Sequence, residues 1–374
     1  MTAEPGPRPA RARWRGAVAG PAVAVAAVLA ALPATRAVGL PLRDPDHVAS
    51  LYLVLVGSGM LVLVGVDILI RAGRGSGSFP PSRAALRKVR QERWTVGRGV
   101  AVGTALVGFY VTYMAYRNLK SVVPLHLPGE LVDRQLAEAD RALFGGHDPA
   151  ALLHDLLGTG IQTHFLSAAY VAFIVFLPLT IGLALVFSRD VQAGLFYTTA
   201  QSINWLLGAA SYFLLPSLGP IYADPAAFAN LPASEVTHLQ GVLLDQRLDF
   251  LRDPASGTPQ SIAGFASLHI SMSFTAALAA HLLRLGRRMK IGLWLWFAVT
   301  TAGTIYLGWH YVLDDVAGMV LGALALALAA GLSGVDLRAA RQRAPATAPR
   351  EAATGWDGDD RARQPSAWPQ TEKR

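Results

Sequence analysis

Apolar residues along this chain gather in long runs and seldom alternate with polar ones. Eight such segments approach the length of about 20 residues that an α-helix needs to cross the hydrocarbon core of a bilayer. They cover residues 17–33, 50–70, 99–116, 164–187, 193–215, 266–283, 291–308 and 310–332. The pattern predicts an all-α protein, a polytopic bundle of about eight transmembrane helices.

The first segment allows two interpretations. Arg8, Arg11, Arg13 and Arg15 precede an Ala/Val run that ends in ALPATRA. Basic residues, a short apolar run and small residues at its end also describe a cleavable signal peptide. We expect a retained signal-anchor helix.

One of the long polar stretches contains a further helical pattern. Leu131, Leu136, Ala139 and Leu143 recur at helical spacing within residues 117–160. A short helix with one apolar face typically lies in the membrane interface. The pattern therefore predicts an amphipathic helix on the membrane surface.

The remaining polar stretches set the domain organisation. Residues 216–265 are rich in Pro and Asp, and we expect them to fold over the outer mouth of the bundle as a lid. The tail after about 336 has no apolar period, so we expect it to be disordered. The chain then divides into a two-span region with a basic loop (1–98), a membrane core (99–335) and a cytoplasmic tail (336–374).

Composition supports a membrane protein and excludes several chemistries. Charged residues make up 16% of the chain, against about 25% in soluble domains. Cysteine is missing, which excludes disulfides, iron–sulfur clusters and thiol catalysis. The net charge of +8 suggests a nucleic-acid partner only at first sight, because the basic residues cluster beside the apolar segments. We expect no nucleic-acid partner.

Basic residues also gather in alternate loops, which predicts the orientation of the chain. The loop 71–98 carries eight of them against the single acid Glu92, and the turn 284–290 and the stretch 338–343 are basic too. Such loops stay in the cytoplasm. We therefore expect both termini in the cytoplasm and the protein in the plasma (inner) membrane.

Ionisable residues next to apolar spans are costly, so they mark functional sites. His310 and Asp314 are four residues apart at the start of the last segment, and on a helix they share a face. Asp315 points about 100° away, and we expect it to be solvated at the membrane surface. Asp67 lies within the second segment and is expected to snorkel to the inner interface. An interfacial aromatic belt is the expected place of three tyrosines, Tyr113, Tyr170 and Tyr311.

Two other segments bring polar side chains to the same outer membrane face. FASLHISMS opens the sixth segment with Ser267 and His269, and Arg117 and Lys120 follow the outer end of the third. Together with the first pair, this set suits phosphoryl transfer. One imidazole attacks phosphorus while a carboxylate orients it, and the other protonates the leaving oxygen. Cations and helix N-termini stabilise the phosphate oxygens, so no metal or other cofactor is required.

The motifs resemble those of a known family. Ser267-Leu268-His269 and His310-Tyr311-Val312-Leu313-Asp314 are similar to the second and third signature motifs of the type 2 phosphatidic acid phosphatase superfamily, membrane lipid phosphatases and phosphotransferases with a six-helix core. The resemblance implies that His310 forms a phosphohistidine, that Asp314 orients it, and that His269 protonates the leaving group. It further implies that Ser267 contacts phosphate. The implied substrates are a lipid phosphate or phospholipid donor and an acceptor, either water or the hydroxyl of a sugar, an inositol or a lipid.

The chain departs from the usual motifs at three places. It has Ala-Ser-Leu-His in place of Pro-Ser-Gly-His at 266–269, and Gly303 and Thr304 in place of Ser-Arg. Lys120 is followed by Pro124 without the usual arginine before the proline. This pattern is more similar to the inositol phosphorylceramide synthase and sphingomyelin synthase branch, whose members move a phospho-headgroup to another acceptor. With the arginine missing, we expect Arg117 and Lys120 to bind the phosphate.

Two other functions explain part of the pattern. A transporter using the same histidines and aspartate as a proton relay predicts polar residues through several spans. The middles of the last three segments are instead almost wholly Ala, Leu, Val and Gly, and we see no pair of broken helices. A catalytically silent scaffold leaves the clustered motif unexplained. An integral membrane lipid phosphotransferase or phosphatase explains the most.

Overall fold

The computed structural model describes residues 10–335, apart from 45, 189, 256–257 and 259–261. The tail expected to be disordered, 336–374, lies outside the described residues. The described chain forms thirteen α-helices and one short 3₁₀ helix. In order they are α1 (Ala10–Ala37), α2 (Val48–Ser76), α3 (Arg83–Arg93), α4 (Val96–His126), α5 (Asp133–Leu143), α6 (Pro149–Leu157), α7 (Ile161–Phe187), α8 (Val191–Leu214), α9 (Pro220–Ala223), η1 (Pro225–Phe228), α10 (Glu235–Arg252), α11 (Leu268–Leu282), α12 (Arg287–Tyr306) and α13 (Val312–Ser333).

The all-α membrane architecture is confirmed, whereas the number of spans is only partly so. A helix covers each of the eight predicted segments, but five of them are long and apolar enough to cross a membrane: α1, α2, α4, α7 and α13. The other three are α11, which has only 15 residues, α12, which opens with RRMK, and α8, which carries many polar residues. An eight-span bundle therefore remains a prediction.

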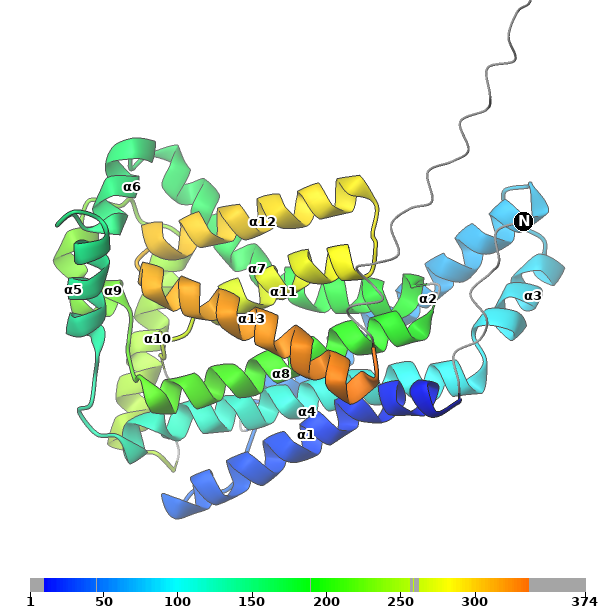
Figure 1. The fold of residues 1–374 in the computed structure, drawn as a ribbon, viewed down its shortest axis with the longest axis horizontal. Helices are drawn as coiled ribbons and strands as arrows, with labels where there is room; N and C mark the ends of the chain where they lie inside the picture. The colour runs from blue at the N-terminus through cyan, green and yellow to red at the C-terminus, as the bar shows by residue number, and fades with distance from the viewer. Residues whose placement is uncertain (1–9, 45, 189, 256–257, 259–261, 336–374) are drawn as a thin grey trace, which may run out of the picture.

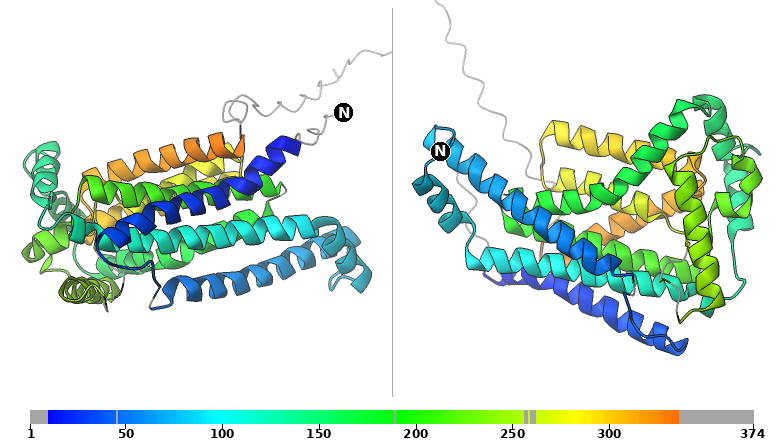
Figure 2. Two further views of the ribbon diagram at one scale, coloured as in Figure 1. Left: turned by 90° about the horizontal axis from the view of Figure 1, so that it is seen from below. Right: turned by 180° about the vertical axis from the view of Figure 1, so that it is seen from behind.

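The helices of the bundle run roughly along one direction, with smaller helices at its two ends (Figures 1 and 2). α4 and α8 lie side by side, and α1 packs along both of them. α13 packs on α8 and α11, while α2 and α12 pack on α7. The helices α5, α6, α9 and α10 gather at one end of the bundle, and α3 lies at the other (Figure 1).

A very close contact between α11 and α13 depends on two glycines. A Cβ atom at Gly318 would lie 2.5 Å from the carbonyl oxygen of Ser267, and one at Gly322 would lie 2.6 Å from that of Ser271. Small residues four positions apart let membrane helices approach backbone to backbone in this way. The contact fixes the position of α13 against the start of α11.

Polar side chains of α8 face α11 and satisfy one another inside the bundle. The amide of Asn204 donates to Thr275 Oγ1 at 2.9 Å and accepts from Ser271 Oγ at 2.7 Å. The amide of Gln201 donates to Tyr197 Oη and to the Met272 carbonyl. Buried polar groups are costly unless they are hydrogen-bonded, and here the bonds tie α8 to α11.

Asp67, expected to snorkel to the inner interface, is buried within the protein. Its side chain is 1% exposed and accepts hydrogen bonds from Arg71 Nε and Arg93 Nε, both at 2.7 Å, and from the Trp94 indole at 3.1 Å. Arg93 and Arg98 also donate to the last carbonyls of α7, at Leu185, Val186 and Ser188. The carboxylate is thus neutralised by cations within the protein, and its place at the inner interface stays a prediction.

The contact between α11 and α13 can be tested with a pair of identical substitutions on one helix. Gly322→Ala places a methyl group against a backbone oxygen, and overpacking of this kind costs about 1–3 kcal/mol. We expect a lower midpoint of thermal unfolding for the purified protein in detergent. Gly331→Ala is the control, since a Cβ atom there meets nothing within 4 Å, and its midpoint should be unchanged or slightly higher. Equal midpoints for the two variants would contradict this account.

Candidate active site

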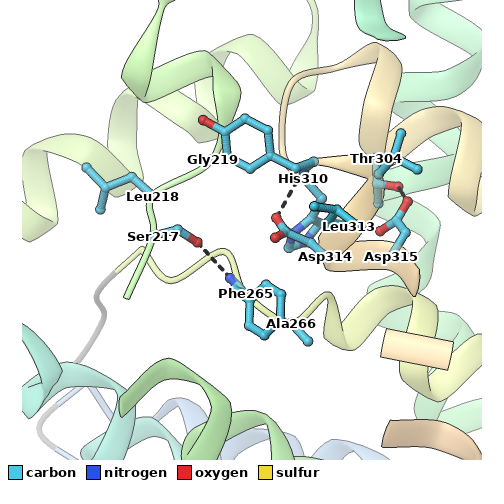
Figure 3. Close-up of polar contacts among 12 residues, drawn as sticks. Ser217, Leu218, Gly219, Phe265, Ala266, Thr304, His310, Leu313, Asp314 and Asp315 are labelled. Carbon is cyan, nitrogen blue, oxygen red and sulfur yellow. Dashed lines mark hydrogen bonds and ion pairs between the residues drawn. The ribbon is translucent and has the colours of Figure 1, made fainter. Parts of the chain in front are cut away.

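His310 and Asp314 form a buried pair at the end of the bundle where α12 gives way to α13 (Figure 3). Gly308, at a φ of 72°, turns the chain between these helices. The His310 ring places Nδ1 3.3 Å from Asp314 Oδ2, and the same oxygen accepts the Tyr311 N–H at 3.0 Å. With the Nδ1 proton directed to the carboxylate, Nε2 keeps its lone pair. The predicted pair thus has the geometry of an oriented nucleophile.

His269, in the first turn of α11, faces this pair. The centroid of its ring lies 6.1 Å from that of His310. It stacks on Tyr170 and packs against Phe173, each at a centroid distance of 4.5 Å. Trp309 stacks on the same Tyr170 at 5.0 Å. The expectation of an interfacial place for Tyr170 was wrong, because its ring is buried between the two histidine-bearing segments.

The segment that leads into α11 is held by the segment that follows α8. Ser217 accepts the Phe265 N–H on its hydroxyl and the Gly264 N–H on its carbonyl, both at 2.8 Å (Figure 3). Ser211 Oγ accepts the Ala266 N–H at 2.9 Å. These bonds fix where α11 begins, and with it the position of the second imidazole.

Ser267 joins the two motifs through its backbone. Its N–H donates to the Asp314 carbonyl at 3.0 Å. Its hydroxyl is fully buried and interacts with the Asp315 carboxylate. Ser267 is also missing from the lining of the cavity described below. The structure therefore places it as a link between α11 and α13.

Two aspartates of α5 hold the outer end of α13, a role that the sequence pattern did not reveal. Asp140 accepts the N–H groups of Val312 at 2.7 Å and Leu313 at 3.2 Å. Asp133 accepts those of Leu218 and Gly219, and the Tyr311 hydroxyl at 3.3 Å. Burial raises the pKa of both carboxyls, although the backbone N–H groups act against that shift.

The helix predicted around 131–143 is present as α5, and its place on the membrane surface stays a prediction. Leu131 and Leu143 are exposed, and the buried positions are Asp133, Leu136 and Asp140. The unbonded N–H groups at the start of α13 need acceptors, which explains why a face with two aspartates is buried. The spacing of seven residues between these aspartates was the available signal, since it places them on one side of a helix.

Asp315 was expected to be solvated, and that prediction was wrong. It is 2% exposed, and its Oδ2 accepts the Thr304 hydroxyl at 2.9 Å (Figure 3). Thr304 lies in the last turn of α12, so a side chain 100° from Asp314 meets the end of that helix and not water. Asp315 thereby ties the end of α12 to the start of α13.

The two predicted phosphate ligands of α4 lie in different surroundings. Lys120 lines the cavity with the histidines, its Nζ 5.7 Å from the centroid of the Tyr116 ring. Arg117 is 5% exposed and pairs with Asp44 at 2.9 Å and with Asp46 at 2.6 Å. Burial alone would raise the pKa of Asp46, but the Arg117 guanidinium lowers it below its usual value. The structure does not bring Arg117 to the cavity, because two acids of the α1–α2 loop engage it.

A cavity of about 330 Å³ opens beside the two histidines. Its walls are mainly aromatic and aliphatic, and its basic side chains are Lys120, His269 and His310. It extends along α4 and α7 as far as Phe109, Leu177 and Pro178. A mostly apolar pocket with a few polar groups at one end is suited to an amphipathic small molecule. Among the described residues no group of three or more His, Asp or Glu is arranged to hold a metal ion.

The cap on α13 generates a prediction about local stability. Asp140→Ala leaves two buried N–H groups without acceptors, and losing a cap costs about 1 kcal/mol. We expect faster amide hydrogen exchange at Val312 and Leu313, measured by mass spectrometry on the peptide that contains them. Glu138→Ala is the control, because Glu138 lies on the same helix, is 60% exposed and pairs only with Arg134. Unchanged exchange in the first variant would show that Asp140 is not the cap.

Comparison with known proteins identifies one family. The model described as "PAP2 superfamily" matches residues 134–328, just over half of the 374 residues. The match runs from α5 into α13 and includes His269, His310 and Asp314. No curated protein and no solved structure matches the chain. The match stands at the level of the superfamily and gives no evidence for a particular branch.

Proposed function

The chain belongs to the PAP2 superfamily, and from this membership and the geometry of the site we propose an integral membrane enzyme that moves phosphoryl groups of lipids. The observation that carries the proposal is the arrangement of His269 across from the His310–Asp314 pair, at the polar end of an apolar cavity. Two facing imidazoles, one of them oriented by a buried carboxylate, are suited to a nucleophile and an acid.

In the first step His310 Nε2 attacks the phosphorus of the bound lipid phosphate. The new N–P bond forms as the bond from phosphorus to the leaving oxygen breaks, and His269 donates a proton to that oxygen. Reacting atoms need to approach to about 3–3.5 Å, and a general acid to about 2.6–3.2 Å. Rings with centroids 6.1 Å apart leave space for a phosphoryl group between them. The products are a phosphohistidine and the released alcohol.

In the second step a hydroxyl group replaces the first leaving group. Its oxygen attacks phosphorus, the N–P bond breaks, and His269 accepts the proton of the hydroxyl. Asp314 stabilises the positive charge that develops on the His310 ring in both steps. Water as acceptor gives hydrolysis, and an alcohol gives transfer.

The negative charge of the phosphate needs donors near the two rings. Lys120 lines the same cavity and supplies a positive charge. The first turn of α11 presents the positive end of a helix next to His269. At the N-terminus of α13 the N–H groups already bond to Asp140, so this end stabilises the phosphate less than the N-terminus of α11 does. We assign Ser267 to positioning instead of direct phosphate contact, since its N–H bonds to the Asp314 carbonyl and its side chain is fully buried.

The substrate class follows from the shape and lining of the cavity. An aromatic and aliphatic groove along α4 and α7 accommodates acyl chains, while the histidines meet the headgroup. The site lies at the end of the bundle opposite the basic helix α3 (Figure 1). Since basic segments stay in the cytoplasm, we place the reaction at the extracytoplasmic face of the plasma (inner) membrane.

Transfer is favoured over hydrolysis by two features. The Ser-Leu-His sequence and the missing arginine before His310 are similar to the inositol phosphorylceramide synthase and sphingomyelin synthase branch. The segment containing α9 and α10 also covers the histidine-bearing loop, with the Gln240 amide donating to Leu307 O and the Ile221 N–H donating to Gly308 O. Such a cover limits access of water to the phosphoenzyme.

The nucleophile is tested by substitution and by trapping. His310→Gln removes the attacking nitrogen, and we expect release of the alcohol from phosphatidic acid in detergent micelles to fall by at least about 1000-fold. Brief incubation with ³²P-labelled substrate should leave acid-labile label on the unmodified protein and none on the variant. His147→Gln changes an exposed histidine of the loop after α5 and is the control. It should still release the alcohol and still take up the acid-labile label. Full activity of His310→Gln would refute the proposed function.

The acceptor is tested by following the phosphate. Labelled phosphatidic acid is incubated with the purified protein, with and without glycerol, inositol or a diacylglycerol whose acyl chains differ from those of the donor. We expect label in a new organic phosphate when the acceptor is present, because the cover limits the competition from water. Label only in free phosphate with every acceptor would limit the enzyme to hydrolysis.

A further inference from the structure

The site as described has little positive charge for a group that carries two negative charges. Superfamily motifs place an arginine six residues before the nucleophile, and this chain has Thr304 there. Thr304 is fully buried and donates to Asp315, so no phosphate reaches that position. Arg117 is occupied by Asp44 and Asp46. Besides Lys120, any further cation at the site comes from another element.

Arg247 of α10 lies at the boundary of the catalytic cavity. It lines a smaller cavity of about 160 Å³, together with the end of α4 and the segment after α8. Four residues line both cavities, which shows that the two adjoin: Tyr212, Leu218, Ile262 and Ala263. Arg247 itself lines only the smaller cavity, and the four shared residues form the boundary between the two spaces.

The guanidinium of Arg247 has few partners in the protein. It is half-buried, and among the described residues it makes one long hydrogen bond, from Nη1 to the Ile262 carbonyl at 3.4 Å, and no ion pair. The acid that acts on it electrostatically is Asp133, whose oxygens already accept the N–H groups of Leu218 and Gly219. Burial lowers the pKa of Arg247, as expected for a cation that lacks a close counter-charge. Desolvating an unpaired charge is costly, and an anion in the adjoining space would offset that cost.

We propose that Arg247 and the smaller cavity form an anion subsite, which binds oxygens of the phosphoryl group held at His310. The inference rests on the proposed function and adds a ligand from the cover helix α10 to it. A guanidinium binds two phosphate oxygens at once, so it also orients the group for attack. Substrate binding and closure of α10 over the cavity are then coupled through one side chain.

Substitutions of Arg247 provide the test. Arg247→Gln removes the charge, and we expect kcat/KM for phosphatidic acid in detergent micelles to fall by about 100-fold. The inhibition constant of inorganic vanadate should rise by a similar factor. Arg247→Lys keeps the charge but not the paired donors, so an intermediate loss is expected. Arg252→Gln is the control, since Arg252 ends the same helix, is 76% exposed and pairs only with Asp249.

A purely structural role for Arg247 predicts different results. Arg247→Ala should regain activity on addition of guanidinium chloride at millimolar concentration, whereas a variant with a damaged fold should not. The same variants are assayed with a phosphoinositide donor that carries further phosphates. A loss confined to that donor would assign Arg247 to a second anionic group and overturn the proposal. Unchanged kcat/KM and vanadate inhibition in Arg247→Gln, with His310→Gln inactive, would refute the subsite alone, while an active His310→Gln would refute the proposed function itself.

Discussion

The close approach of α11 and α13 is the constraint on which the rest of the site depends. His269 lies in the first turn of α11, and His310 comes directly before the N-cap of α13, so the distance between the two rings is set by how the helices meet. Gly318 and Gly322 allow backbone contact, and the Ser267 N–H bonds to the Asp314 carbonyl at the point where the helices begin. Because the helices are in contact along several turns, a small shift in either one would separate the imidazoles. Catalytic geometry of this kind requires rigid support.

The loop between α12 and α13 is fixed by hydrogen bonds from the helices that pack over it. The carbonyls of Tyr306, Leu307 and Gly308 are hydrogen-bonded to His154, to Gln240 and to the N–H of Ile221. These partners come from three different segments of the outer layer, α6, α10 and α9. A loop whose carbonyls are satisfied by several elements has little freedom to rearrange. The outer layer therefore positions His310 as well as covering it.

The sequence predicted those parts of the site that depend on local spacing. The spacing of four residues correctly predicted that His310 and Asp314 meet, although His310 lies just before the N-cap of α13 and the contact forms at the helix start, where Asp314 also accepts the Tyr311 N–H. The long apolar runs likewise predict most of the bundle. The contact of His269 with Tyr170 depends on packing between α7 and α11, which no periodicity reveals. Asp315 was misjudged because its solvent exposure depends on where α12 lies.

The number of membrane spans is also difficult to predict from sequence, because it depends on contacts between helices. Hydropathy identifies helices that face lipid. α8 instead faces other helices through Gln201 and Asn204, so it is too polar to be recognised as a lipid-facing span. α11 is too short to cross alone by the usual measure, although it packs between longer neighbours. Helices inside a bundle are selected for contact with other helices, and length and hydropathy are then weak guides.

Arg117 illustrates how a correct observation about charge can lead to the wrong role. Its place at the outer end of α4 suggested phosphate, but Asp44 and Asp46 draw it to the α1–α2 loop. The same loop carries Arg43, which donates to the carbonyls of Pro254 and Ala255 just after α10 and whose backbone N–H bonds to Asn118. The guanidinium of Arg117 thus belongs to a chain of contacts that anchors the far end of the cover helix. If that cover decides whether water or another hydroxyl reaches the phosphoenzyme, then Arg117 acts on the outcome of the reaction through the lid, from a position where it never meets the phosphate.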